Sequence, residues 1–402
     1  MTTPPAGDAD DPLEGLRVLD LTTMISGGFS TVMFADFGAD VISVEHPTYE
    51  DPVRGWAPRS DGESLYWKNL GRNKRHVTLD LSADGGQRLA RELAADADLV
   101  FENFRPGTLE RWGLDYETLS ADNDDLILVR ISGYGQTGPK SSKPGFGTVA
   151  ESISTFAHIN GFPDTSPLLP PIPLADLTAA MFAVQGAMFA LYARDEQGGQ
   201  VVDTSLYEPL FRLMVGDVEA YDLADRVPDR TGNISVQAAP RNLYPTEDGY
   251  IALSAASQNI FENVMAAIDR EDLIDDPRFE TNEDRIEHRE QLDDIIEDWT
   301  ADRTREEALA EMEATDAIVG PVYTMADAFE DEHYADREDI VAVEDDDLGE
   351  VRTHGVFPKL SETPGTVDHL GGNHGEHNEA VFLDELGLSR EELQRLREEG
   401  VV

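Results

Sequence analysis

The strongest candidate for chemistry in this sequence is one carboxylate, Asp176, which stands directly before a predicted helix over residues 177–194. One interpretation is structural, because an aspartate there accepts the free N–H groups of the first helical turn and favours the helix dipole. The other is catalytic, because an ionised carboxylate can attack an acyl group without a general base. Small residues follow it, which favours close approach of a ligand: Ala179, Ala180, Ala183 and Gly186. Both interpretations remain open at this point.

Residues 54–75 form the most basic segment of a very acidic chain. Six Lys and Arg stand there against two acids, whereas the whole chain has 31 Lys and Arg and 81 Asp and Glu. Such a cluster is typical of a phosphate-binding site, and the alternative is a hub of ion pairs. The cations are Arg54, Arg59, Lys68, Arg72, Lys74 and Arg75, and Arg105, Arg111, Lys140 and Lys143 extend the set into neighbouring loops.

The composition excludes several classes of protein and site. With no cysteine in 402 residues, the chain has no disulfide, thiolate metal ligand or cysteine nucleophile. The net charge of −50 argues against nucleic acid as a partner, because phosphates must meet a positive surface. Acids spread along the chain, with few lysines, are typical of proteins that work in molar salt. We therefore expect a halophilic cytoplasm, no membrane partner and no secretory signal in residues 1–12.

Strands and helices alternate in the first half of the chain. Buried strands are predicted at residues 16–22 and 41–45, around a short helix over 31–37 that a Gly27-Gly28 loop opens. Further strands are predicted at 77–81, 99–102, 126–132 and 200–205, and further helices at 85–95, 107–112 and up to about 225. This alternation predicts an α/β fold with a Rossmann-like, doubly wound sheet, and places Asp176 at a cleft on its carboxyl edge.

A change of composition after residue 225 predicts a smaller second domain. It contains a strand at 250–254 and acidic helices at 258–269, 283–300 and 304–314. We predict a large Rossmann-like domain in residues 1–225, a small domain in 226–322, and a return to the large domain in 323–402, which ends in a helix over 390–398.

Several segments, in order along almost the whole chain, resemble the class III CoA-transferases, the CaiB/BaiF family. The resemblance covers residues 14–402 and rests on GLRVLDLTTMISGGFSTVMFADFGADVISVEHP, GRNKRHVTLDL, FENFRPGTLERWGLDYETL, SGYGQTGP, GQVVDTSLYE and GGNHGEHNEAVFLDELGLSREELQRLREEGVV. It implies a Rossmann-like large domain with an inserted smaller α+β domain, in an interlocked homodimer. It also implies acyl-CoA and carboxylic acid substrates, with no tightly bound cofactor.

The resemblance also assigns site residues. Asp176 falls on the family's catalytic aspartate, which forms an acyl anhydride and then an aspartyl-CoA thioester. The implied CoA contacts are Met24, Ile25, Ser26, His46, Arg54, Asn73, Lys74, Arg75, Asn103, Phe104, Arg111 and Lys143. Backbone amides of Gly27 and Gly28 are our hypothesis for the oxyanion donors.

Two other functions are weighed against CoA transfer. An acyl-CoA racemase of the same fold needs a histidine where this chain has Phe146, in PGFGTVA, and a CoA-binding protein without activity has no use for Asp176. His374 and His377 are spaced like metal ligands, but no third ligand has a defined position, so we predict a turn with helix capping and no metal. For substrates we expect a C4–C5 dicarboxylate pair, with succinyl-CoA as donor and mesaconate as a candidate acceptor.

Overall fold

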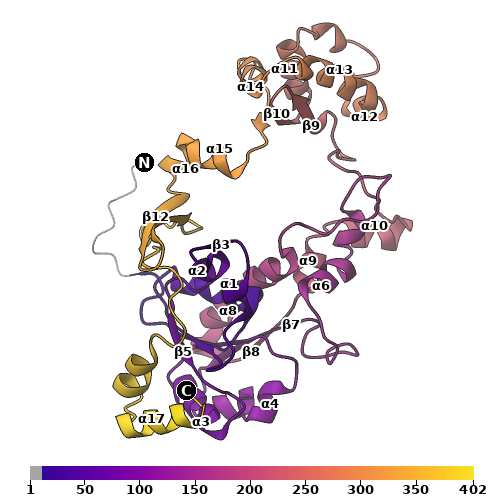
Figure 1. The fold of residues 1–402 in the computed structure, drawn as a ribbon. Coiled ribbons are helices and arrows are strands. Elements are labelled where there is room, and N and C mark those ends of the chain that lie inside the picture. Colours follow the sequence, from indigo (N-terminus) through magenta and orange to yellow (C-terminus); the bar gives the residue numbers. More distant parts are fainter. Residues whose placement is uncertain (1–10) are drawn as a thin grey trace. The chain divides into compact units, whose positions relative to one another are not determined.

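The computed structural model describes residues 11–402, which form two compact units (Figure 1). The first unit comprises the chain up to Ala157, Leu169–Glu219 and His333–Val402, and the second comprises His158–Leu168 and Ala220–Glu332. The predicted small domain, residues 226–322, falls within the second unit. The prediction that residues 1–12 hold no secretory signal lies almost wholly outside the described residues.

A parallel sheet of six strands is the centre of the first unit, in the order β5-β2-β1-β6-β7-β8. The strands are β1 (Arg17–Asp20), β2 (Asp40–Glu45), β5 (Arg75–Thr78), β6 (Leu99–Glu102), β7 (Ile127–Ser132) and β8 (Val201–Ser205). Every residue of β6 and β7 is buried, as expected where helices cover both faces of a parallel sheet. The predicted α/β fold with a parallel central sheet is confirmed.

Helices pack on both faces of this sheet because successive strand residues point to opposite sides. Leu19 belongs to a core with α3 (Asp84–Ala95) and α17 (Arg390–Glu398). Its neighbour Val18 belongs to a second core with α1 (Met24–Ala35) and α8 (Leu174–Gln197). The second of these cores buries an alanine stripe of α8: Ala175, Ala179, Ala183, Ala187 and Ala190.

Two helices begin earlier than the sequence predicts. α1 begins at Met24, so Gly27 and Gly28 lie inside the helix and do not form the predicted loop. A Cβ on Gly27 would lie 2.1 Å from the side chain of Thr22, so this glycine serves close packing. α8 begins at Leu174, which places Asp176 inside the first turn.

The remaining elements of the chain are short, and one predicted helix is divided: α9 (Glu208–Arg212) and α10 (Asp217–Ala224) replace the single helix expected up to residue 225. The others outside the second unit's core are η1 (Pro52–Gly55), β3 (Arg59–Ser60), β4 (Glu63–Ser64), α2 (Leu65–Leu70), α4 (Thr108–Trp112), α5 (Tyr116–Ser120), α6 (Gly147–Ile153), α7 (Phe156–Ile159), α16 (Glu332–Asp336), β12 (Ile340–Asp345), β13 (Gly349–His354) and η3 (Ala380–Glu385).

The second unit has its own core, built on a three-stranded antiparallel sheet in the order β11-β10-β9. Tyr244 and Ile251 of the sheet pack with Phe261, Leu292 and Met312 of the helices. Its elements are β9 (Arg241–Thr246), β10 (Gly249–Ser254), α11 (Gln258–Ala267), η2 (Glu271–Leu273), α12 (Asn282–Glu287), α13 (Arg289–Ala301), α14 (Arg305–Glu313), β11 (Val319–Pro321) and α15 (Met325–Glu330).

The last two residues of the chain complete the first unit. The carbonyl oxygen of Val401 accepts a hydrogen bond of 2.8 Å from the amide of Asp80, and both Val401 and Val402 are buried in the core that contains Leu19. The space above Gly85 is filled by Val401 and Leu396.

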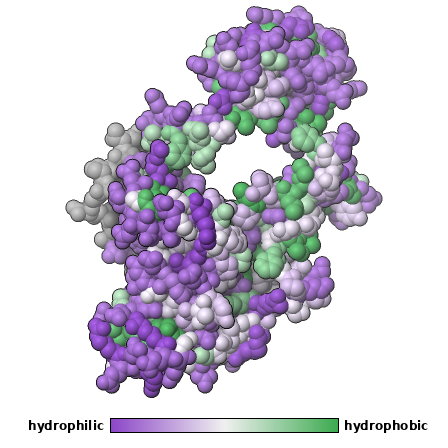
Figure 2. All heavy atoms as spheres, viewed as in Figure 1, coloured by the Kyte–Doolittle hydropathy of each residue, from purple (hydrophilic) through white to green (hydrophobic). Residues whose placement is uncertain are grey.

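Hydrophilic residues cover most of the face that Figure 2 shows, in line with the acidic composition. Among residues 11–402, one helix, α8, is long and apolar enough to cross a membrane by length and composition alone. Its alanine stripe lies against the sheet, so α8 also fits the description of a core helix.

Candidate active site

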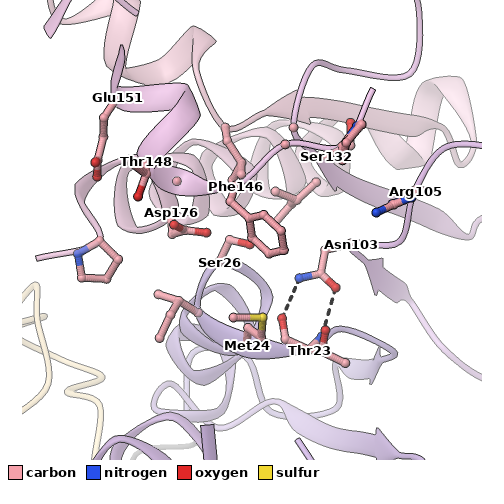
Figure 3. A pocket seen from close by; sticks show the side chains of 18 of the residues that line it. Thr23, Met24, Ser26, Asn103, Arg105, Ser132, Phe146, Thr148, Glu151 and Asp176 are labelled. Carbon is pink, nitrogen blue, oxygen red and sulfur yellow. Dashed lines mark hydrogen bonds between the residues drawn. The ribbon is translucent and has the colours of Figure 1, made fainter. Parts of the chain in front are cut away.

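A cavity of about 580 Å³ opens in the first unit at the carboxyl ends of β1, β6 and β7 (Figure 3). Ligands bind at this edge in open α/β sheets, and the volume is within the usual range for small-molecule sites. The lining comes from Thr23–Ser26, Asn103–Pro106, Ile131–Gly133, Lys143–Thr148 and Leu169–Pro173, with Trp56, Glu151, Asp176 and Leu206.

Asp176 is half-buried in this cavity, in the first turn of α8. Burial raises the pKa of its carboxyl group to about 6, and the negative charge of Glu151 adds to the rise. The N-cap interpretation is wrong, because the N-cap position is Pro173 and no side chain caps the helix there. The carboxylate therefore lies in the cavity with a raised pKa, in the first turn of α8 but not at its N-cap.

Helix α6 covers the carboxylate of Asp176. A Cβ on Gly147, its first residue, would lie 2.2 Å from Oδ2 of Asp176, so any side chain there would displace this oxygen. One turn further on, Glu151 is 4% exposed, and its Oε1 accepts a hydrogen bond of 3.4 Å from the amide of Ala175. Neither residue was predicted to belong to the site, because a lone glycine or a lone glutamate has no distinctive pattern.

The first turn of α1 forms another wall of the cavity. Asn103 bonds both backbone groups of Thr23, at 3.0 and 2.7 Å, and joins the loops after β6 and β1. Met24 has a φ of 64°, in the left-handed region, and its amide donates to Oδ2 of Asp51 at 2.8 Å. The predicted contacts Met24, Ile25 and Ser26 thus do line the cavity.

The predicted oxyanion donors change with the start of α1. A helix leaves the N–H groups of its first turn without partners inside the helix, whereas deeper N–H groups bond to carbonyls one turn back. Gly27 and Gly28 lie in the deeper part. The N–H groups of Thr23 and Met24 already have side-chain acceptors, so the amides of Ile25 and Ser26 replace the glycines as candidates.

Ser132, at the carboxyl end of β7, presents an unpartnered hydroxyl to the cavity. The residue is 6% exposed, and its Oγ has no hydrogen-bond partner among the described residues. Beside it, a Cβ on Gly133 would lie 2.7 Å from the Cα of Gly145, so two backbones cross without room for side chains. Buried polar atoms are seldom unpaired, so this hydroxyl is a candidate to form a hydrogen bond with a ligand in the cavity. Ser132 begins the SGYGQTGP segment of the sequence analysis, but no role was predicted for its hydroxyl.

Two cations line the same cavity. Arg105 and Lys143 are exposed, and no ion pair of either side chain occurs between residues 11 and 402. Figure 3 shows Arg105 at the end of the cavity away from Asp176 and Glu151. Phe104, also predicted, lines the cavity and packs against Trp112.

The basic segment does not line the cavity, apart from Trp56, and most of its cations are paired. The structure favours the ion-pair hub over the free phosphate site, because five of the six cations meet carboxylates. The pairs are Arg54 with Glu45, Lys68 with Asp345 and Asp347, Arg72 with Asp36, Lys74 with Asp20, and Arg75 with Asp40 and Glu385.

Other predicted CoA contacts also have partners within the protein. Asn73 bonds Asp36 and Thr366, and its Oδ1 accepts from the amides of Asp368 and His369. Arg111 donates to Gly107 and Thr108 within its own helix. His46 accepts from the amides of Thr48 and Tyr49 through Nδ1. None of these three lines the cavity.

The two histidines near the C-terminus contact backbone groups. Nδ1 of His377 accepts from the amide of His76, and Nε2 of His374 lies 3.1 Å from the carbonyl oxygen of His46. Across residues 11–402, no three His, Asp or Glu side chains lie close enough together to hold a metal ion.

Comparison with known proteins gives consistent matches over the chain. The model of the family described as CoA-transferase family III matches residues 13–378. Succinyl-CoA--D-citramalate CoA-transferase of Chloroflexus aurantiacus is 42% identical over 97% of this chain and 98% of its own. The beta subunit of succinyl-CoA--L-malate CoA-transferase from the same organism is 38% identical over 97% and 98%. The crystal structure of a CAIB/BAIF family protein from Brucella suis covers 94% of this chain and 100% of its own, with a TM-score of 0.84 and 29% identity.

Proposed function

Because the chain belongs to CoA-transferase family III, we propose that Asp176 is the nucleophile of a CoA transfer between two dicarboxylic acids. The observation that carries the proposal is the state of this carboxylate. It stands half-buried in the cavity at the sheet's carboxyl edge, with a pKa raised to about 6 and without a cationic partner among residues 11–402. At neutral pH it is mostly ionised, and it is more basic than an ordinary aspartate.

The reaction needs no proton transfer. The carboxylate oxygen of Asp176 attacks the thioester carbonyl of the donor, and the C–S bond breaks. CoA departs as a thiolate, and the donor acyl group remains on Asp176 as a mixed anhydride. The thiolate then attacks the side-chain carbonyl of Asp176, which releases the donor acid and forms an aspartyl-CoA thioester. The acceptor carboxylate attacks this thioester, displaces the thiolate and forms a second mixed anhydride, between the acceptor and Asp176. Attack of the thiolate on the acceptor's carbonyl forms the new acyl-CoA and frees Asp176.

The surrounding groups have complementary tasks in this proposal. The amides of Ile25 and Ser26 point a partial positive charge at the developing oxyanion. The hydroxyl of Ser132 bonds the CoA arm, and Arg105 and Lys143 attract its phosphates. The walls around Asp176 limit the access of water, which hydrolyses both covalent intermediates.

For the substrates, we propose succinyl-CoA as donor and a C4–C5 dicarboxylic acid as acceptor. The names of the two Chloroflexus relatives support the donor and offer citramalate and malate as acceptors, and mesaconate remains our candidate of the same size class. The racemase alternative has no support at Phe146, which lines the cavity and carries no proton-transfer group.

We further propose a homodimer that works in a salt-rich cytoplasm. Large apolar side chains are exposed on α8 and along residues 211–223, among them Phe189, Tyr192, Val215 and Leu223, each at least 67% exposed. Figure 2 shows apolar residues on the viewed face around α9 and α10. A second copy that covers them would remove this surface from water.

The test is a transfer assay in high salt. Purified protein is incubated with succinyl-CoA and one free acid at a time, and new acyl-CoA species are followed by mass spectrometry, with Asp176→Ala in parallel. We expect CoA transfer to one or more C4–C5 dicarboxylates and none in the variant. Full activity of Asp176→Ala would rule out the proposed nucleophile, and no transfer to any dicarboxylate would rule out the substrate class.

A further inference from the structure

Helix α6 is fixed to the first turn of α8 at two points, one helical turn apart. Gly147 lies against Oδ2 of Asp176, and Glu151 holds the amide of Ala175, the residue before the nucleophile. Figure 3 shows Glu151, Thr148 and Asp176 at the same end of the cavity. The buried glutamate is therefore placed at the nucleophile by the fold and not by a flexible loop.

No positive charge compensates this pair of carboxylates. The ionisable residues that line the cavity are Asp176, Glu151, Arg105 and Lys143, and within residues 11–402 neither carboxylate has an ion pair. Helix α1, which packs on α8, carries no charged residue, and α6 carries only Glu151. The other elements that pack on α8 carry Arg130 of β7, Asp203 of β8, and Glu208 and Arg212 of α9, and none of these lines the cavity. Along α8 itself the next charged residue after Asp176 is Arg194, five turns away. The charge that acts on Asp176 is thus mainly that of Glu151.

We propose that Glu151 is a positioning residue whose charge favours acylated Asp176 over the free carboxylate. This inference rests on the proposed role of Asp176. Two like charges in a poorly solvated site repel each other, and the repulsion ends when Asp176 becomes a neutral anhydride or thioester. The free enzyme is raised in energy relative to both covalent intermediates, so acylation is faster and the aspartyl-CoA thioester persists until the acceptor arrives.

The variant Glu151→Gln tests this directly. Glutamine has nearly the same shape and keeps an oxygen for the amide of Ala175, but it has no charge. In the transfer assay we expect the wild type to lose kcat/KM below about pH 6, the raised pKa of Asp176, and we expect this acid limb to lie about one pH unit lower in Glu151→Gln. We also expect kcat at pH 8 to fall about tenfold, KM for succinyl-CoA to change little, and intact-protein mass spectra to show less aspartyl-CoA thioester.

Two further variants make the result specific. Glu151→Asp keeps the charge and should retain an acid limb close to that of the wild type. It is also the variant to measure if Glu151→Gln does not fold, and a displaced acid limb in Glu151→Asp would contradict the inference. Ser152, next to it on α6, donates its hydroxyl only to the carbonyl oxygen of Thr148, so Ser152→Ala should change nothing. A folded Glu151→Gln with an unchanged acid limb would overturn the inference, as would a raised KM with unchanged kcat. Activity in Asp176→Ala would instead reject the proposed function, whatever Glu151→Gln does.

Discussion

The basic segment at residues 54–75 and the cavity around Asp176 treat charge in opposite ways. In the segment, Lys74 is 2% exposed, and its Nζ contacts Oδ2 of Asp20 at 3.2 Å and Oγ1 of Thr31 at 2.7 Å. In the cavity, Asp176 is half-buried and Glu151 is buried, and neither has a cationic partner within the described residues. The segment holds many charges, and most of them are neutralised by ion pairs. The cavity holds few charges, and its two carboxylates have no ion pair within residues 11–402.

This difference separates stability from chemistry. A paired, buried ion contributes to the fold mainly because its removal leaves the partner uncompensated. An unpaired ion in a cavity costs stability, and the energy becomes available to a reaction that removes the charge. The predictions below test whether the two regions are divided in this way.

The largest effect is expected for Lys74→Met. It leaves Asp20 buried without its cation, which should lower the free energy of unfolding by about 3–5 kcal/mol, measured by urea denaturation in high salt. The matched control is Arg59→Met, an exposed residue that bonds only the carbonyl of Arg54. If Lys74→Met is stable but has a raised KM for CoA, the segment binds substrate and the division fails.

A smaller loss is expected for Gly147→Ala. The new methyl group would stand 2.2 Å from Oδ2 of Asp176 and must displace it. A nucleophile moved by about 1 Å should lose about 100-fold in kcat, while thermal unfolding stays close to that of the wild type. Gly320→Ala is the control, because its Cβ meets open space. A fully active Gly147→Ala would show that the carboxylate does not react from this position.

Asp176→Asn should stabilise the protein. The folded state raises the pKa of Asp176 from 3.8 to about 6, so its ionised form costs stability wherever the unfolded chain is ionised. The cost is complete above pH 6 and shrinks as the pH falls from 6 towards 3.8. We expect a gain of about 2 kcal/mol at pH 8, and a smaller gain at pH 5, by urea denaturation at both values. A stability loss at pH 8 would show that the ionised carboxylate has partners in the fold.

The smallest effect is expected for Arg105→Ala. This exposed cation should raise KM for succinyl-CoA about tenfold at low salt, and less in molar salt, where its attraction for phosphate is screened. Stability should not change, because within residues 11–402 the side chain has no carboxylate partner. A KM that is independent of salt would place Arg105 away from the bound anion.

The sequence predicted the parallel sheet well, because buried runs such as Leu99–Glu102 and Ile127–Ser132 depend on local composition. It misjudged the start of α1, since Gly27 resembles a helix breaker and its packing against Thr22 is visible only in three dimensions. For the same reason the ion-pair partners of the cations in residues 54–75 could not be predicted, because these carboxylates come from distant strands and loops.

Within the site, several predicted residues line the cavity: Met24, Ile25, Ser26, Asn103, Phe104, Lys143 and Asp176. The first five lie in segments that resemble the family. No site role was predicted for Glu151 or Ser132, although Ser132 lies in one of these segments. Their importance depends on what the folded chain leaves without a partner, and a sequence records residues without recording which of their hydrogen bonds remain unmade.

The burial of Val401 and Val402 has a consequence for how this protein is made. The core around Leu19 needs the first strand and residues 401 and 402, so it cannot close until these residues have left the ribosome. The second unit, whose core lies between Tyr244 and Val319, can close while synthesis continues.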